Sequence, residues 1–148
     1  GETSVQEFIQ QFRQEFESLP LADISFPRGL NGLHKYSNEV TIYGSGTPIH
    51  VRGALLYNHL IDKLKLSKKY PLIQNGEKLK YIFLKEPNMI QSNVISFPQG
   101  GIPEEFYLSK YVDYDKQFEK AFLDPLKIIL DSIGWKTEKT SSLEDFFA

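Results

Sequence analysis

The chain has 148 residues, 41% of them apolar, and a formal net charge of −2. This length and composition fit one globular domain with a buried core and argue against a disordered chain. The near-neutral charge argues against a protein that coats nucleic acid over its whole surface, and the lack of cysteine excludes disulfides and thiolate metal sites. No apolar run approaches the ~18 residues of a membrane span. The start, GETSVQEF, lacks the basic and apolar regions of a secretory signal, so we expect neither a signal peptide nor a membrane partner.

Charge is unevenly distributed along the chain. Residues 1–23 carry five acidic groups and one Arg, residues 63–85 carry seven Lys against one Glu, and residues 104–148 carry ten acidic against six basic groups. A basic middle segment between two acidic ends can form a surface that faces phosphates. Composition alone favours the ordinary alternative, which is a face of solvated lysines.

The first predicted element is a helix over residues 4–18, where Val, Phe and Ile recur at helical spacing. Ser4 and Glu7 fit a capping box, in which each side chain would bond to the other residue's backbone N–H. Pro20 ends the run.

The following segment is broken by Pro and Gly, and only residues 40–43 (VTIY) are predicted as a strand there, the rest as loop. A helix is predicted after Gly53, within residues 51–66. Residues 74–86 (QNGEKLKYIFLKE) contain an Asn-Gly turn and then apolar residues that alternate with lysines, which is typical of a half-buried strand with one basic face. Residues 93–98 (NVISFP) are predicted as its partner strand.

Helical periodicity returns between Asp113 and Ile133. Asp124 followed by Pro125 fits an N-cap and a first helical position, so two helices or one kinked helix are predicted, ending at Gly134. The predicted fold class is therefore α+β. It comprises an N-terminal helix, a small central antiparallel sheet with Gly/Pro-rich loops and one helix, and a C-terminal helical segment with a flexible tail.

The segment YVDYD (111–115) holds two carboxylates one residue apart, a spacing that two-metal nucleotidyl transferases use on a strand. Because helical periodicity follows at once, Asp113 or Asp115 is better interpreted as an N-cap or first-turn acid. No phosphate-binding, dinucleotide-binding or serine-nucleophile motif occurs. A metal site is also not predicted at the three histidines, which show no ligand spacing: His34, His50 and His59.

The stretch DISFPRGLNGLHKYS (23–37), followed by TIYGSGTPIHVRGALLYN (41–58), resembles the C-terminal thumb-region sequence of the replicative family B DNA polymerases of T-even-type bacteriophages. In that family a helix leaving the palm leads into F-P-R-G, K-Y-S and G-T-P-I-H-V-R-G-A segments and then a helix. A later G-E-K strand and a long helical segment follow, and NGEKLKYIFL stands in the place of that strand here. The resemblance covers most of the chain.

The resemblance implies part of a polymerase, and both an excised thumb region and the product of a split gene fit it. Family B polymerases bind two metal ions through palm aspartates, and the palm motifs Y-G-D-T-D-S and S-L-Y-P-S are absent from these 148 residues. The exonuclease acids and the nucleotide-binding lysine helix are missing too. The chain alone is therefore expected to be inactive and to hold no cofactor, because magnesium would belong to the palm. The implied partner is the palm and fingers portion of the polymerase, in the cytoplasm of an infected bacterial host.

A thumb region would hold the primer–template duplex through sugar-phosphate and minor-groove contacts without reading its sequence. Glycine-rich loops suit this role because they let backbone N–H groups approach phosphates. The DNA-binding residues predicted on this basis are Arg28, Gly29, Lys35, Tyr36, Gly46, Thr47, His50, Arg52, Lys78 and Lys80. We expect the basic strand with Lys78 and Lys80 to share one surface with Arg28, Lys35 and Arg52. The competing interpretations are turn geometry for the glycines and a buried ion pair for Arg52.

Residues 1–139 are interpreted as the thumb-like domain and residues 140–148 (TSSLEDFFA) as a clamp-binding tail. Leu143, Phe146 and Phe147 stand at i, i+3 and i+4, on one side of a single helical turn. A lone turn is unstable in water, so the tail is expected to fold only in the groove of a partner. Packing of both rings on the chain's own domain is the alternative. The resemblance favours a partner, because the family ends in a Leu/Phe peptide that docks on the sliding clamp.

Two functions from different classes follow. The first is a thumb region that grips primer–template DNA during replication and is tethered to a sliding clamp. The alternative is a protein-interaction module with the same fold, which binds the clamp or a polymerase subunit and has little DNA affinity of its own.

Overall fold

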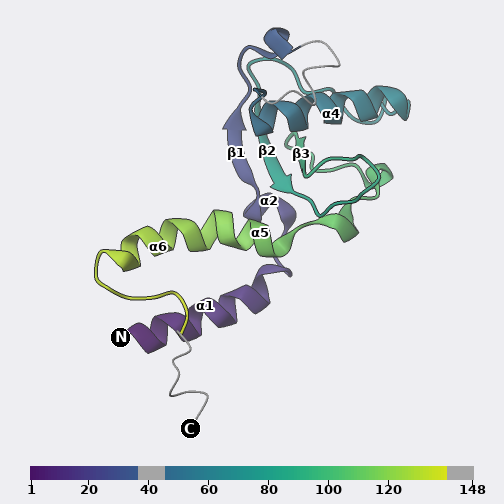
Figure 1. The fold of residues 1–148 in the computed structure, drawn as a ribbon. Coiled ribbons are helices and arrows are strands. Elements are labelled where there is room, and N and C mark those ends of the chain that lie inside the picture. The colour runs from purple at the N-terminus through teal and green to yellow at the C-terminus, as the bar shows by residue number, and fades with distance from the viewer. Residues whose placement is uncertain (37–45, 140–148) are drawn as a thin grey trace.

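The computed structural model of the chain describes residues 1–36 and 46–139, and it shows the predicted α+β fold (Figure 1). Helix α1 (Glu2–Phe16) lies beside the segment formed by α5 (Tyr114–Phe118) and α6 (Asp124–Asp131). The sheet and helix α4 (Ile49–Lys63) form the other end of the molecule. The predicted strand at 40–43 and the predicted tail from 140 lie outside the described residues.

The sheet is antiparallel, with the order β1-β2-β3. Its strands are β1 (Phe26–Gly29), β2 (Lys78–Phe83) and β3 (Val94–Phe97), and the last two confirm the predicted pair. The Asn-Gly turn before β2 is also confirmed, with Gly76 at a φ of 87°. The prediction of a loop at β1 was wrong. β1 contains Pro27, but it is an edge strand, where proline's missing N–H can face away from the ladder.

The register of the strands sorts their side chains between two faces. Directly opposite residues of antiparallel strands point to the same side, and the register pairs Phe26 with Tyr81 and Phe83 with Val94. We call the resulting side the aromatic face, and its residues are Phe26, Arg28, Leu79, Tyr81, Phe83, Val94 and Ser96. Lys78 and Lys80 alternate with these residues along β2 and therefore project from the opposite face.

Helix α4 begins at Ile49, so Gly53 lies inside the helix and not ahead of it as predicted. Gly53 is buried against β3, where an added Cβ would lie 2.4 Å from Oγ and 2.7 Å from the backbone nitrogen of Ser96. Glycine thus allows helix and strand to approach closely. The Ser96 hydroxyl donates to the carbonyl of His50 at 2.8 Å, which holds the first turn of α4 on β3.

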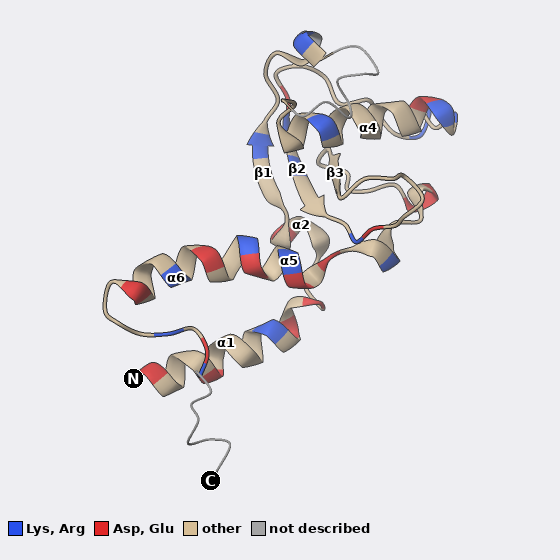
Figure 2. Cartoon of the chain, viewed as in Figure 1, with Lys and Arg blue, Asp and Glu red and all other residues tan. Residues whose placement is uncertain are grey.

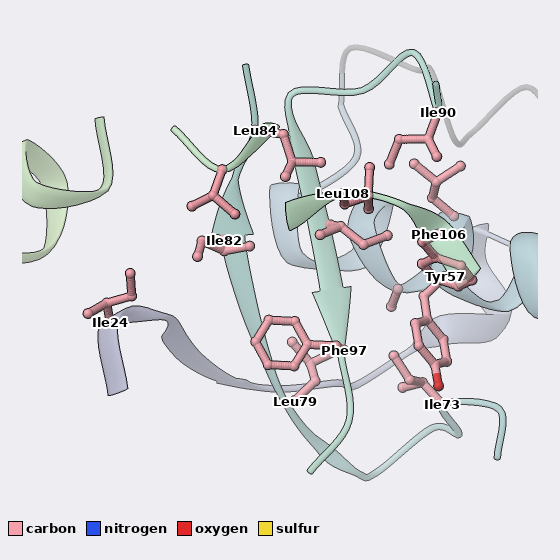
Figure 3. Packing of buried hydrophobic residues seen from close by; sticks show 14 of the residues in the cluster. Ile24, Tyr57, Ile73, Leu79, Ile82, Leu84, Ile90, Phe97, Phe106 and Leu108 are labelled. Carbon is pink, nitrogen blue, oxygen red and sulfur yellow. The ribbon is translucent and has the colours of Figure 1, made fainter. Parts of the chain in front are cut away.

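The main hydrophobic core lies between α4, the sheet and the segment that follows β3 (Figure 3). Tyr57 of α4 is fully buried, and its ring meets that of Phe106 edge to face at 5.7 Å. The Tyr57 hydroxyl donates to the carbonyl of Pro71 at 3.2 Å, so the polar end of this core residue is satisfied.

Aromatic rings hold the helical layer together. Phe12 of α1 contacts the rings of Phe118 and Phe122 at centroid distances of 5.9 and 4.8 Å, and Phe16 contacts Phe118 at 5.1 Å. The short helix α2 (Leu21–Ile24) then leads from α1 to β1. None of the described helices has the length and apolar character needed to cross a membrane.

Helix ends agree with the sequence in part. The predicted capping box is wrong, because α1 already begins at Glu2 and Ser4 lies inside its first turn. The C-terminal helical segment is interrupted by a π-helical turn, Glu119–Leu123, just before Pro125. Such a widened turn tolerates the missing N–H of proline. The predicted N-cap at Asp124 is wrong, because Asp124 is already helical and is the first residue of α6, with Leu123 at the cap position. Gly134 follows α6 with a φ of 75°, as expected of a residue that ends a helix.

Gly53→Ala is expected to lower the free energy of unfolding by at least about 1 kcal/mol, because the methyl group would overlap backbone atoms of Ser96. This loss should exceed the gain in helix propensity, which is at most ~1 kcal/mol. Urea unfolding measures the change. Gly100→Ala is the control, since a Cβ there meets open space, and it should change stability by less than about 0.5 kcal/mol. Equal stability of Gly53→Ala and the parent would contradict the close contact.

Candidate nucleic-acid interface

Arg28 and Tyr81 form the first part of the site. Arg28 is exposed on β1, and its guanidinium carbon lies 5.6 Å from the centre of the Tyr81 ring. Phe26 stacks on the same ring with centroids 5.1 Å apart. Only 6% of Tyr81 is exposed, so its ring supports a cation and is not a free surface on which a base could stack.

Lys116 occupies the same position over the next ring of the aromatic face. Its Nζ lies 4.5 Å from the centre of the Phe83 ring, and the rings of Phe83 and Tyr81 are 6.1 Å apart. Phe83 is 8% exposed and also serves as a support. Sequence reasoning did not select Lys116, because no local pattern links the start of α5 to β2.

Buried hydrogen bonds hold the start of α5 against the end of β2. The carbonyl of Phe83 accepts from the N–H of Asp113 at 3.0 Å, and its N–H donates to Oε1 of Gln117 at 3.1 Å. Nε2 of Gln117 in turn donates to the carbonyl of Ile24. Asp113 caps α5, as predicted, by accepting the N–H of Lys116 at 3.0 Å. These bonds fix the backbone of Lys116 relative to Phe83.

The first turn of α4 brings His50 next to Arg28 and Gly29. Burial is the main cause that lowers the pKa of His50, and the charge of Arg28 lowers it further. A hydrogen bond with the backbone of Gly29 acts in the opposite direction and raises this pKa. The imidazole is therefore mostly neutral at pH 7. Ile49 of the same turn packs on the apolar cluster that contains Tyr81 and Phe83.

Arg52 is half-buried on α4, and its guanidinium donates to Oδ1 of Asn93 at 2.7 Å. Within residues 1–36 and 46–139, the basic partners of the ion pairs are Arg13, Lys69 and Lys120. The alternative of a buried ion pair for Arg52 is thus not observed in the described part of the chain. Among the described residues, its guanidinium is held by a neutral amide, which does not compensate its charge.

The positions of Lys78 and Lys80 differ from the prediction of one shared basic surface. They project from the face opposite to Arg28, so the expectation that they share one surface with it was wrong. The ammonium of Lys80 donates to the carbonyl of Ala22 at 2.7 Å. The error has a simple physical cause. The register between β1 and β2 decides which residues of β2 share a face with Arg28, and β1 was not predicted from the sequence.

The other predicted DNA-binding residues lie on either side of the segment 37–45, which is outside the described residues. Lys35 is exposed and Tyr36 half-buried in the 3₁₀ turn Leu33–Tyr36. The N–H of Leu33 donates to Oδ1 of Asn75 at 3.0 Å, which ties this turn to the Asn-Gly turn before β2. Gly46 is exposed and Thr47 half-buried just ahead of α4.

Charge separates the two ends of the molecule. Acidic side chains outnumber basic ones on α1, and the two kinds alternate through α5 and α6, whereas β1, β2 and the first turns of α4 carry Lys or Arg without acids (Figure 2). Three acids lie within three residues of Lys116. Asp113 caps α5, Oδ1 of Asp115 lies 3.8 Å from Nη1 of Arg13, and Glu119 lines a pocket together with Lys116. Asp113 and Asp115 are helix-start acids, as predicted, and the sheet end is the more basic part of the molecule.

The described part of the chain is thus an α+β domain with cations held over buried rings on one face of a small sheet. No protein-family model matches the chain. Its sequence is similar to the DNA-directed DNA polymerase of Enterobacteria phage T4, with 29% identity over 99% of the chain. It is also similar to that of Escherichia phage RB69, with 31% identity over 89% of the chain.

These matches confirm the resemblance to phage DNA polymerases that the sequence motifs indicated. The chain spans 16% of the length of the T4 enzyme and 14% of the RB69 enzyme. It therefore corresponds to a small part of such a polymerase, and the similarity supports a polymerase-related function.

The contact between His50 and Arg28 predicts the titration of the imidazole. The midpoint, followed by NMR of the ring protons, should lie below the ordinary value of 6.5. Arg28→Ala should raise it, because one of the two causes of the lowered pKa is removed. Lys78→Ala, on the opposite face, is the control and should leave the midpoint in place. An unchanged midpoint in Arg28→Ala would show that the two side chains are not neighbours.

Proposed function

We propose that the chain is the thumb region of a phage-type family B DNA polymerase and that it grips the primer–template duplex with the aromatic face and the first turn of α4. The observation that carries this proposal is the placement of His50, in the first turn of α4, beside the exposed Arg28 of β1. Arg52 follows two residues further along α4. The similarity of almost the whole chain to two phage DNA polymerases supports it.

The contacts suit binding that does not depend on base sequence. The guanidinium of Arg28 is exposed and can donate to two phosphate oxygens at once. Gly29 is exposed next to it, and a Cβ there would meet only Asn31, so a phosphate can approach the backbone closely. The positive end of the α4 dipole points toward the same region. Phosphate contacts of this kind hold a duplex in place without reading it.

The chain supplies a grip, and the chemistry belongs to other parts of the enzyme. We propose that the palm and fingers portion is its partner, that magnesium is held there, and that the complex works in the cytoplasm of an infected bacterium.

Two double variants test the grip, because each removes two positive charges. The first pair comes from β1 and α4, and the second comes from the opposite face of the sheet. Arg28→Ala/Arg52→Ala should weaken binding of a labelled primer–template and reduce the slope of log K against log salt by up to about two. Lys78→Ala/Lys80→Ala should keep a slope close to that of the parent. Fluorescence anisotropy at low and moderate salt gives both values, and the thermal midpoints show that the variants are folded.

Three outcomes separate the alternatives. A salt slope reduced only by the lysine pair would place the grip on the opposite face. Lys78 and Lys80 would then bind DNA, as the sequence predicted, but without Arg28. Equal effects of both pairs would refute a grip confined to one face. Absence of salt-dependent binding by the parent would favour the protein-interaction module.

We also propose that residues 140–148 tether the chain to a sliding clamp. Leu143, Phe146 and Phe147 have the spacing of three anchors on one helical turn, and Glu144 and Asp145 between them keep such a segment soluble. The polar residues 137–142 would act as the linker. The proposal rests on this spacing and on the resemblance to the clamp-docking peptide of the family.

Phe146→Ala/Phe147→Ala is expected to abolish clamp binding, since truncating two buried aromatic anchors costs at least a few kcal/mol, about the difference that removes a micromolar contact. Calorimetric titration of the clamp with the intact and the altered chain measures this loss. Glu144→Gln/Asp145→Asn is the matched control, because it alters the same turn and keeps the anchors. Undiminished binding by the double Phe variant would contradict the tether.

A further inference from the structure

We propose that Lys116 is a further phosphate-contacting residue and that the rings of Tyr81 and Phe83 are positioning residues, which hold Arg28 and Lys116 as a pair of fixed cations. The inference rests on the proposed DNA grip and deepens it. It adds a residue from α5 to a surface otherwise built from β1 and α4, and it gives the buried rings of the aromatic face a role in binding.

The geometry of the two rings carries the first step. Both cations lie within the ~6 Å range in which an aromatic ring attracts a positive charge, at 5.6 Å for Arg28 and 4.5 Å for Lys116. Tyr81 and Phe83 are successive residues on one side of β2, so the two cations stand over neighbouring rings of one strand. The two rings are 6.1 Å apart, so cations held over them are candidates to meet neighbouring phosphates of a duplex backbone.

The fixed position of each cation is the second step. A free lysine or arginine side chain loses rotamer freedom when it binds, and this loss opposes binding. Tyr81 and Phe83 are buried and packed with Phe26, so they cannot move away from the cations. The backbone of Lys116 is held as well, through the bonds of Asp113 and Gln117 to Phe83. Part of the conformational entropy that these side chains would lose on binding is therefore already lost in the free protein.

The partners of other lysines show why Lys116 differs from them. Lys69 and Lys120 form ion pairs with Glu105 and Asp124, and Lys80 donates to a backbone carbonyl. Lys116 is a half-buried residue, and its ammonium lies over the face of the Phe83 ring at 4.5 Å. A ring face is not a strong hydrogen-bond acceptor, so it does not use up the N–H donors of the ammonium. These donors are thus suited to phosphate oxygens.

The test compares single variants of the whole chain in the primer–template anisotropy experiment. Lys116→Ala should reduce the salt slope by about one, as expected for the loss of one phosphate contact, and Lys116→Arg should restore it. Phe83→Leu should weaken binding two- to fivefold at constant salt but keep the parent slope, because the charge stays and only its support is removed. Lys120→Ala is the matched control on the same helical run and should match the parent, because Lys120 is paired with Asp124.

A second measurement covers the case in which Phe83→Leu does not fold. The Phe83 ring should shift the side-chain protons of Lys116 upfield in the NMR spectrum of the free parent protein, and ordinary lysine shifts would overturn the support. If Arg28→Ala reduces the salt slope while Lys116→Ala behaves like Lys120→Ala, the role of Lys116 is refuted and the grip stands. If neither variant changes the slope, the grip itself fails.

Discussion

The buried side chain of Gln117 joins the two parts of the molecule. Its amide oxygen accepts the N–H of Phe83 at the end of β2, and its amide nitrogen donates to the carbonyl of Ile24 at the end of α2. Both partners are buried, so loss of this amide would leave an N–H and a carbonyl without partners in a medium of low dielectric constant. The same bonds set the distance between α5 and the sheet, on which the position of Lys116 over Phe83 depends.

The aromatic face is a product of packing between distant segments. Arg28 of β1 lies on this face, α4 places His50 beside Arg28, and the start of α5 places Lys116 over Phe83. Arg52 of α4 bonds to Asn93 just ahead of β3. The close contact of Gly53 with Ser96 brings the first turn of α4 to the sheet. Each cation or imidazole has a neutral support: a ring for Arg28 and Lys116, an amide for Arg52 and a backbone group for His50. Among the described residues, none of these cations forms an ion pair, although Lys116 lines a pocket that also contains acidic residues of α5 and of the helical run that follows it.

Local sequence patterns predicted the helices, strands and turns whose formation depends on residues close together in the sequence. The amphipathic spacing of α1, the alternation in β2, the turn at Gly76 and the helix end at Gly134 all appear in the structure. β1 was not predicted, because proline is unfavourable in a central strand. Only the sheet order shows that Pro27 lies on an edge strand, where it is tolerated. The predicted start of α4 was too far along the chain, because glycine is common at helix boundaries. Gly53 instead lies inside the helix and allows close contact with β3.

The same limit applies to the candidate site. Arg28, His50 and Arg52 were found through the resemblance to a polymerase family, and the face of Lys78 and Lys80 could not be known without the register of β1. Lys116 carries no sequence signal at all, since its partner is a ring on another element.

The proposed grip requires that the aromatic face, and not the opposite face of the sheet, meets the duplex. Assigned NMR spectra of the chain, recorded while primer–template DNA is added at moderate salt, distinguish the two faces. We expect the signals of Arg28, His50, Arg52 and Lys116 to move together with a single affinity, while those of Lys78 stay in place. Movement of the Lys78 signals with unchanged signals for Arg28 and Arg52 would show that the duplex meets the opposite face.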